Sequence, residues 1–207
     1  LARWLTDHRN ALVWRSIVNR VWHYHFGRGL CDTPNDFGKM GGTPSHPELL
    51  DWLAVDFRDG GQSLKKLHRL IVTSATYRQS SLGHPANEKI DTSNAFLWRM
   101  NRRKLEAEAV HDSVLAVAGK LDLTMGGPGF DLFKPMTNYV KVYVTKEEFL
   151  PGDYRRMVYQ SKPRAMLDDF FGAFDCPDAG QIAPKRTRST TALQALNLLN
   201  SPFMVQQ

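Results

Sequence analysis

One short acidic stretch near the middle of the chain carries the side chains best suited to acid–base or metal chemistry. Glu108 and His111 are three residues apart, so a helix places them on one face, as the Glu-x-x-His motif of helical di-metal sites requires. Such a site needs a second copy of the motif, and the sequence has only one. The neighbouring Arg102 and Arg103 favour salt bridges to Glu106 and Glu108 instead. We therefore expect no metal site in this chain.

Six polar residues are candidates for catalysis if the domain is an enzyme. A general base must lie within hydrogen-bond reach of the group that it activates, and spacing along the chain does not establish this. The sequence contains no nucleophile elbow, zinc-protease helix, phosphate-binding loop or dinucleotide fingerprint. The candidates are Asp36, His46, Arg69, Arg102, Glu106 and Glu108.

A second candidate set consists of amide side chains on two predicted helices together with one arginine and two aromatic residues. The amides lie beside apolar residues at helical spacing, and a buried amide must find hydrogen-bond partners. One interpretation is a network between helices that fixes their register, and the other is a polar pocket for a sugar-like or amide ligand. The candidate ligand-binding residues are Asn19, Arg20, Trp22, Tyr77, Gln194 and Asn197.

The other histidines and the cysteines do not indicate a cofactor. His23 and His25 are two residues apart, so a helix points them about 200° apart and prevents them from chelating one metal. Cys31 and Cys176 allow one disulfide at most, and their pairing stays open. No Cys-x-x-Cys-His sequence occurs, so c-type haem is not attached covalently here. We expect no cofactor in this chain.

Apolar residues at intervals of three and four predict helices in the first half of the chain. The first long helix spans about residues 11–26, with Asn10 as its N-cap and Gly27 as its C-terminal stop. Ser45 and Glu48 have the spacing of a capping box, so the second helix begins there and ends near residue 59.

The second half is predicted to be helical apart from one small hairpin. Val140, Val142 and Val144 alternate with polar or aromatic residues, as in a half-buried strand, and residues 155–160 are its expected partner. The fold class is therefore mainly α, an irregular multi-helix domain with a small β-hairpin around residues 139–160. Further helices are expected after a cap at Ser63 and over about 103–121, 163–174 and 190–207, the last burying Leu193, Leu196 and Leu199.

Positive charge is concentrated in the first half. The net charge is +6, and residues 1–103 hold 15 Lys and Arg against 9 Asp and Glu, whereas residues 104–207 hold 12 of each. The arginines are dispersed among Trp and Leu, so we expect most of them to be solvated or paired. Polyanion binding is kept as an alternative, and nucleic acid is not an expected partner.

Length and hydropathy limit the organisation of the chain. Its 207 residues are 42% hydrophobic, which is enough to fill the core of one domain. No stretch reaches the ~18 consecutive apolar residues of a membrane span. Leu1 is not an initiator Met, and helical spacing already begins there. We expect residues 1–207 to be a single helical domain, a fragment of a larger multidomain protein.

Seven ordered blocks of sequence carry a family resemblance. They are Ile17–Trp22, His25–Leu30, Pro44–Leu53, Leu67–Gln79, Trp98–Arg103, Leu105–Ala109 and Leu193–Asn197. Together they resemble the planctomycete-type domain of unknown function fifteen-fifty-three, and the resemblance covers nearly the whole chain. In that family an arginine is usual at the position of His111, which further weakens the metal interpretation.

The resemblance implies a position toward the C-terminal end of a large exported bacterial protein, downstream of a planctomycete cytochrome c domain. It therefore implies a periplasmic, secreted or cell-surface location, haem c in the upstream part of that protein, and more helix beyond Gln207. It implies no reaction, so no residue inherits a catalytic role.

We therefore expect a non-catalytic helical module that docks against neighbouring domains of the same polypeptide or binds a polymer such as polysaccharide. One alternative is the catalytic domain of a haem-linked enzyme acting on extracellular polysaccharide, and another is a polyanion or nucleic-acid binding domain. Convergence of the six catalytic candidates in one pocket favours the enzyme, and a continuous basic groove favours the third reading.

Overall fold

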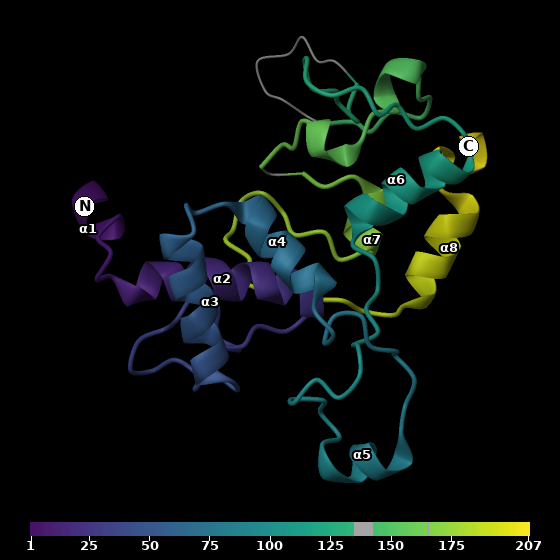
Figure 1. Cartoon of the computed structure of the whole chain (residues 1–207). Helices are drawn as coiled ribbons and strands as arrows, with labels where there is room; N and C mark the ends of the chain where they lie inside the picture. The colour runs from purple at the N-terminus through teal and green to yellow at the C-terminus, as the bar shows by residue number, and fades with distance from the viewer. Residues whose placement is uncertain (135–142, 165) are drawn as a thin grey trace. The chain divides into compact units, whose positions relative to one another are not determined.

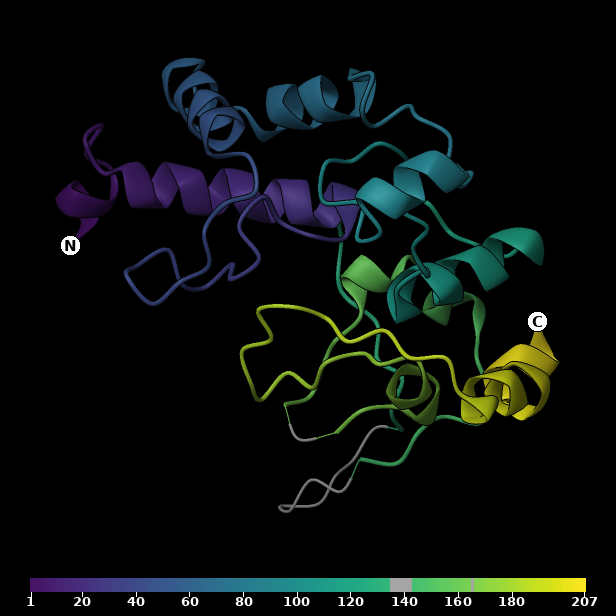
Figure 2. The same cartoon turned by 90° about the horizontal axis from the view of Figure 1, so that it is seen from below.

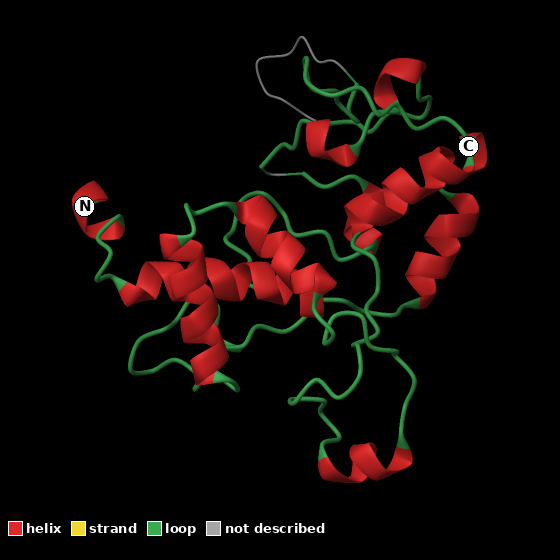
Figure 3. Ribbon diagram, in the orientation of Figure 1, coloured by secondary structure: helices red, strands yellow, loops and turns green. Residues whose placement is uncertain are grey.

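The chain divides into two compact units of helices joined by loops (Figure 3). The computed structural model describes residues 1–134, 143–164 and 166–207. Unit 1 is Leu1–Arg103 and unit 2 is Lys104–Gln207. The mainly helical fold class is confirmed, and the expectation of a single domain stays a prediction.

Unit 1 is built around α2 (Ala11–Phe26), against which α3 (Pro47–Asp59) and α4 (Leu64–Thr73) pack (Figure 1). The predicted limits of α2 are confirmed. Gly27 follows it with a φ of 79°, a left-handed conformation that glycine adopts without a steric penalty. The core residues recur at helical spacing and include Trp14, Val18, Trp22 and Phe26 of α2, Leu50, Leu53 and Phe57 of α3, and Leu67 and Ile71 of α4.

Caps define where two of these helices begin. Ser63 accepts a hydrogen bond from the Lys66 amide and caps α4, as predicted. The capping box predicted at Ser45 is wrong, because the N-cap of α3 is His46. The Ser45 amide and hydroxyl both donate to the Leu30 carbonyl, so this residue anchors the preceding loop instead. The short helices α1 (Ala2–Leu5) and α5 (Pro85–Ile90) bury no residue.

Unit 2 contains α6 (Ala107–Val117), α7 (Asp169–Ala173), α8 (Ala192–Asn200) and α9 (Pro202–Gln206), with α7 in contact with both α6 and α8 (Figure 2). Two 3-10 turns, η1 (Pro151–Asp153) and η2 (Met157–Tyr159), lie between α6 and α7 in sequence. The core is rich in phenylalanine and includes Leu115, Phe130, Phe149, Phe170, Phe171 and Phe203.

The helices of unit 2 are shorter than the apolar periodicity predicts. Glu106 is the N-cap of α6, and Gly119, with a φ of 70°, follows its last turn, so the helix expected over residues 103–121 loses both ends. Asp168 caps α7 through the Phe170 amide, so the helix expected over residues 163–174 begins later. Pro202 ends α8 and opens α9, because its ring cannot continue a helix.

The buried stripe predicted for the last helix is wrong. Leu193, Leu196 and Leu199 are 61%, 53% and 71% exposed. The face of α8 that turns inward carries Gln194, which is buried because its side chain bonds Thr191 and Ser189. Three leucines of α8 therefore face outward from unit 2.

The β-hairpin predicted around residues 139–160 is not supported. Residues 139–142 lie outside the described residues, and the described parts of the chain contain isolated bridges but no strand. Arg155 bridges to Asp122 and Gln160 to Phe130. The carbonyls of Tyr154 and Tyr159 accept hydrogen bonds from the Asp122 and Phe130 amides. Thr145, on the other arm of the expected hairpin, bridges to Phe133 and not to residues 155–160.

No helix within residues 1–134, 143–164 and 166–207 has the length and apolar character needed to cross a membrane.

Candidate functional site

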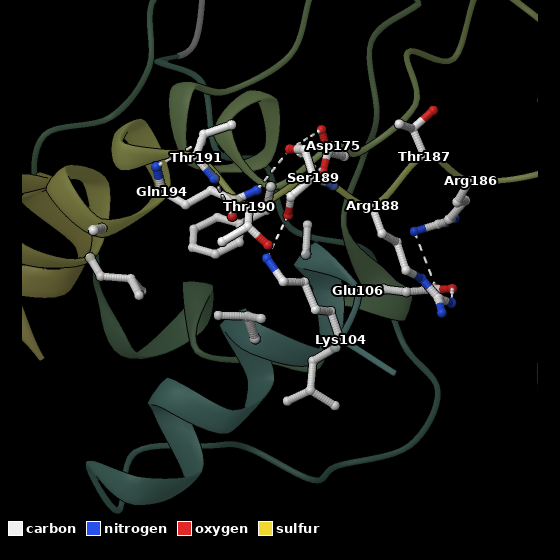
Figure 4. Close-up of a pocket in the computed structure, with 16 residues that line it drawn as sticks. Lys104, Glu106, Asp175, Arg186, Thr187, Arg188, Ser189, Thr190, Thr191 and Gln194 are labelled. Carbon is white, nitrogen blue, oxygen red and sulfur yellow. Dashed lines mark hydrogen bonds and ion pairs between the residues drawn. The ribbon is translucent and has the colours of Figure 1, made fainter. Parts of the chain in front are cut away.

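Unit 2 encloses a hollow of about 340 Å³ between the N-terminus of α6, the end of α7, the segment 186–191 and α8 (Figure 4). Most of the exposed surface of its lining is apolar, and a polar edge follows segment 186–191. The apolar lining consists of Leu105, Ala107, Val110, Phe174, Ala195 and Leu198. The polar edge consists of Lys104, Glu106, Asp175, Arg186, Thr187, Arg188, Ser189, Thr190, Thr191 and Gln194.

Ser189 is the centre of a hydrogen-bond network at this edge (Figure 4). Its amide donates to Asp175 Oδ2 at 2.6 Å, and its hydroxyl donates to the same carboxylate at 2.8 Å. Lys104 Nζ donates to the Ser189 carbonyl at 2.6 Å, and Gln194 Nε2 donates to Ser189 Oγ at 3.3 Å. The bonds from Ser189 hold the pKa of Asp175 below its ordinary value, so Asp175 is a carboxylate at neutral pH.

The two arginines of segment 186–191 are paired with the glutamates at the start of α6. Arg186 donates to both carboxylate oxygens of Glu108, at 2.6 and 2.9 Å, and its Nη1 lies 3.2 Å from Glu106. Arg188 donates to Glu106 at 3.1 Å. Burial raises the pKa of Glu108, but the hydrogen bonds from Arg186, a backbone hydrogen bond and the charges of Arg186 and Lys162 together lower it further, so the net pKa lies below its ordinary value. Both glutamates are thus ion-paired with arginines of segment 186–191.

A buried cysteine, Cys176, contacts the Glu108 carboxylate of the Arg186–Glu108 pair. Cys176 Sγ is 3.7 Å from Glu108 Oε1 and 3.1 Å from Lys162 Nζ. Burial raises the pKa of the Cys176 thiol, although Lys162 acts in the opposite direction. Cys176 is therefore a thiol at neutral pH, and Cys31, in unit 1, is also free and buried.

The six catalytic candidates are divided between the two units. Glu106 and Glu108 belong to the arginine pairs of unit 2, while the other four belong to unit 1. Asp36 accepts a hydrogen bond from the Gly38 amide, and His46 packs its ring against Phe96. Arg69 and Arg102 are exposed.

Of the ligand-binding candidates, only Gln194 lines the hollow. Asn19 is fully buried and bonds both backbone groups of Cys31, at 2.8 and 2.9 Å, which is a structural role. A Cβ on Gly29 would lie 2.7 Å from Asn19 Oδ1, so this clamp requires glycine there. Arg20 forms a hydrogen bond with Asn35, and Trp22 stacks on Phe26 in the core of unit 1. Tyr77 packs edge-on against His25 and Phe26. In unit 2, Asn197 donates a hydrogen bond to the Asp169 carbonyl.

Four residues that complete the site are not among the candidates singled out in the sequence. Asp175, Arg186, Arg188 and Ser189 lie in segments without helical periodicity, so no pattern marked them. The alternation of basic residues at 186 and 188 was the available signal. The salt bridges predicted for Glu106 and Glu108 exist, but their partners are these distant arginines and not Arg102 and Arg103.

In the described parts of the chain, His, Cys, Asp and Glu side chains do not gather in groups of three that could hold a metal ion. Glu108 faces Arg186, and His111 lies among phenylalanines, stacked on Phe203 with 4.3 Å between ring centroids.

The model of the family described as PSD1, protein of unknown function (DUF1553), matches residues 1–207. The chain belongs to this family. The expected family membership is thereby confirmed. No curated protein and no solved structure matches the PSD1 chain. Because the PSD1 description names no activity, the geometry of the hollow carries the functional argument.

Proposed function

We propose that this PSD1 chain is a non-catalytic docking module whose hollow and outward leucines receive a segment of a neighbouring domain of the same polypeptide. The observation that carries the proposal is the position of α8. This helix lines the apolar hollow with Ala195 and Leu198 and presents Leu193, Leu196 and Leu199 to the outside.

Burial of this surface supplies a driving force for docking. Removing apolar surface from water stabilises a complex by roughly 25 cal/mol per Å². Val205 of α9, which is 73% exposed, adds to the three leucines. Contiguous exposed apolar side chains beside a hollow are typical of protein interaction sites.

The hydrogen bonds already formed within the polar edge favour an apolar polypeptide over a sugar or a substrate as the ligand. A sugar site offers side chains whose donors and acceptors are free for the ligand. Here the carboxylates of Asp175, Glu106 and Glu108 already accept bonds from Ser189, Arg186 and Arg188. The same pairing argues against acid–base catalysis, since the pKa values of Glu108 and Asp175 both lie below the ordinary value of a carboxyl group.

Some of the positive side chains of unit 1 are not free to contact a polyanion. Several of its cations lie in ion pairs with nearby carboxylates, although these pairs leave the net charge of the unit unchanged. These pairs are Arg9–Asp7, Arg15–Asp51, Arg28–Asp32, Arg58–Asp59 and Lys66–Asp56.

The proposal includes the setting of the natural polypeptide. We propose an extracytoplasmic location and a haem-bearing domain upstream, and the support for both is the resemblance of the seven sequence blocks. In this setting the chain positions other domains and carries no cofactor of its own.

Hydrogen exchange measured by mass spectrometry tests the docking. The chain alone is compared with the same residues inside the longer natural polypeptide. The α8 amides are expected to exchange at least about tenfold more slowly in the longer protein, equal to about 1.4 kcal/mol of docking free energy. The double variant Leu196→Glu, Leu199→Glu is expected to remove this difference, because it places charge in the apolar contact.

Val117→Glu is the matched control, since Val117 is 91% exposed, lies on α6 and does not line the hollow. It should leave the protection of α8 unchanged. Equal exchange of α8 in the two proteins would overturn the docking proposal. Protection of α8 in the isolated chain by soluble polysaccharide would replace it with polymer binding.

A further inference from the structure

Lys162 holds its amine directly against the sulfur of Cys176. Nζ lies 3.1 Å from Sγ and donates a second hydrogen bond to the Pro177 carbonyl at 2.7 Å. The bond to Pro177 anchors the amine at the residue next to the cysteine. Lys162 is exposed, and these two hydrogen bonds restrict its amine to a position against the sulfur.

A carboxylate completes the group. Glu108 Oε1 lies 3.7 Å from the Cys176 sulfur and is its second polar contact. Arg186 holds this carboxylate in place with two hydrogen bonds. The Cys176 sulfur thus contacts both an amine and a carboxylate that can accept a proton. The docking surface does not use Lys162 or Cys176.

We propose that Lys162 and Cys176 are a modification site at which hydrogen peroxide forms a covalent nitrogen–oxygen–sulfur bridge. In the first step the sulfur attacks peroxide, an S–O bond forms, the O–O bond breaks, and the products are a sulfenic acid and water. In the second step the amine and the sulfenic acid each lose one hydrogen to a second peroxide, an N–O bond forms, and two waters leave. One thiol, one amine and two peroxides give the bridge and three waters.

The separation of the two atoms favours a bridge with an inserted oxygen. A direct N–S bond would require Nζ and Sγ to approach from 3.1 Å to a single bond length, whereas an oxygen between them joins atoms close to their present positions. The amine also lies where it intercepts the sulfenic acid before a further peroxide converts it to sulfinic acid. The bridge closes a loop that contains α7 (Asp169–Ala173).

The reaction is slow at neutral pH and accelerates as the pH rises. It needs the thiolate of Cys176 and the neutral amine of Lys162. Burial raises the pKa of this thiol, so the thiolate is scarce near neutrality. Hours of exposure to an excess of peroxide are therefore the appropriate condition.

Intact-mass and peptide mass spectrometry of the peroxide-treated chain test the proposal. The expected product gains one oxygen and loses two hydrogens, about 14 Da, yields one cross-linked peptide containing Lys162 and Cys176, and reverts with dithiothreitol. A Cys31→Ser background excludes disulfides to the other cysteine. If Cys176 remains a thiol, or reaches sulfinic acid while Lys162 stays unmodified, the proposal is overturned.

Lys162→Arg and the native Cys31 provide the controls. The arginine keeps the positive charge but lacks the reactive amine, so the cross-linked product is expected to be lost while Cys176 still oxidises. Cys31 is as buried as Cys176, and its sulfur contacts the oxygens of Thr33 and Gly42. In the native chain it should form no nitrogen–oxygen–sulfur bridge, and a 14 Da gain on Cys31 or in Lys162→Arg would contradict the assigned geometry.

Discussion

His111 has a side chain suited to catalysis, and its surroundings convert it into a core residue. The ring is 2% exposed, stacks on Phe203 and contacts Phe170 and Phe171. Burial lowers its pKa to about 4, although Asp112, 3.5 Å away, favours the charged form. At neutral pH the imidazole is uncharged and packs as an aromatic ring.

The lowered pKa of His111 predicts acid sensitivity of unit 2. The folded pKa of His111, about 4, lies below the ordinary histidine value of 6.5. The stability that the neutral ring contributes is therefore complete above pH 6.5 and is lost as the pH falls toward 4. The loss is about 3 kcal/mol at most. His111→Phe is expected to flatten this pH dependence, measured as the free energy of unfolding in urea across that range. His84→Ala, at an exposed position, should keep the native slope, and an unchanged slope in His111→Phe would refute the assignment.

Three of the residues singled out in the sequence lie at the polar edge of the hollow or beside it, and their roles stay predictions. Glu106, Glu108 and Gln194 were candidates from the sequence, and the structure places all three at or beside the hollow. Their partners were not predictable, because Arg186 and Arg188 are about 80 residues away along the chain and no local pattern links the two segments. Ion pairs of this kind are decided by the tertiary fold.

At the scale of elements, α8 combines a well-defined start with an unexpected orientation. Thr191 Oγ1 accepts from the Gln194 amide at 3.3 Å, and Gln194 Oε1 lies 3.5 Å from the Thr191 amide, which forms a capping box. The cap ties the first turn to Ser189 through the same glutamine. It therefore sets both the start of α8 and the face that it turns inward.

Thr191→Ala is expected to destabilise the first turns of α8 by about 1 kcal/mol, because the amide of Gln194 loses its acceptor. Amide exchange in α8 should rise about fivefold. Thr190→Ala, one residue earlier, serves as the matched control, because the cap of α8 does not use Thr190. Exchange that rises equally in both variants would show that the cap does not set the stability of this helix.

Helix limits were predicted well where caps and apolar periodicity agree. The limits of α2 and the Ser63 cap of α4 follow from local side-chain and backbone preferences. The helix expected over residues 103–121 was too long, because apolar spacing continues past the cap at Glu106 and past Gly119. Periodicity identifies a helix more reliably than it identifies its ends.

At the scale of the whole molecule, each unit has a hydrophobic core of its own. Leu50 in unit 1 and Leu115 in unit 2 are both completely buried and provide matched probes of the two cores. Separate cores are the physical basis for separate unfolding.

Leu50→Ala is expected to destabilise unit 1 by about 2–5 kcal/mol through the lost burial and the cavity that it leaves. Hydrogen exchange should accelerate in the core helices of unit 1 and stay unchanged in unit 2, and Leu115→Ala should give the reverse pattern. If either variant accelerates exchange in both units together, the chain unfolds as the single domain that the sequence analysis expects.

The sequence alone was sufficient for the mainly helical class, the family and the start or end of several helices, because these depend on periodicity, capping and motifs within a few neighbouring residues. The outward leucines of α8, the pairing of Arg186 with Glu108 and the contact of Lys162 with Cys176 required the tertiary structure. Each of these depends on which distant segments meet, and burial and electrostatics select that arrangement over the whole fold rather than residue by residue.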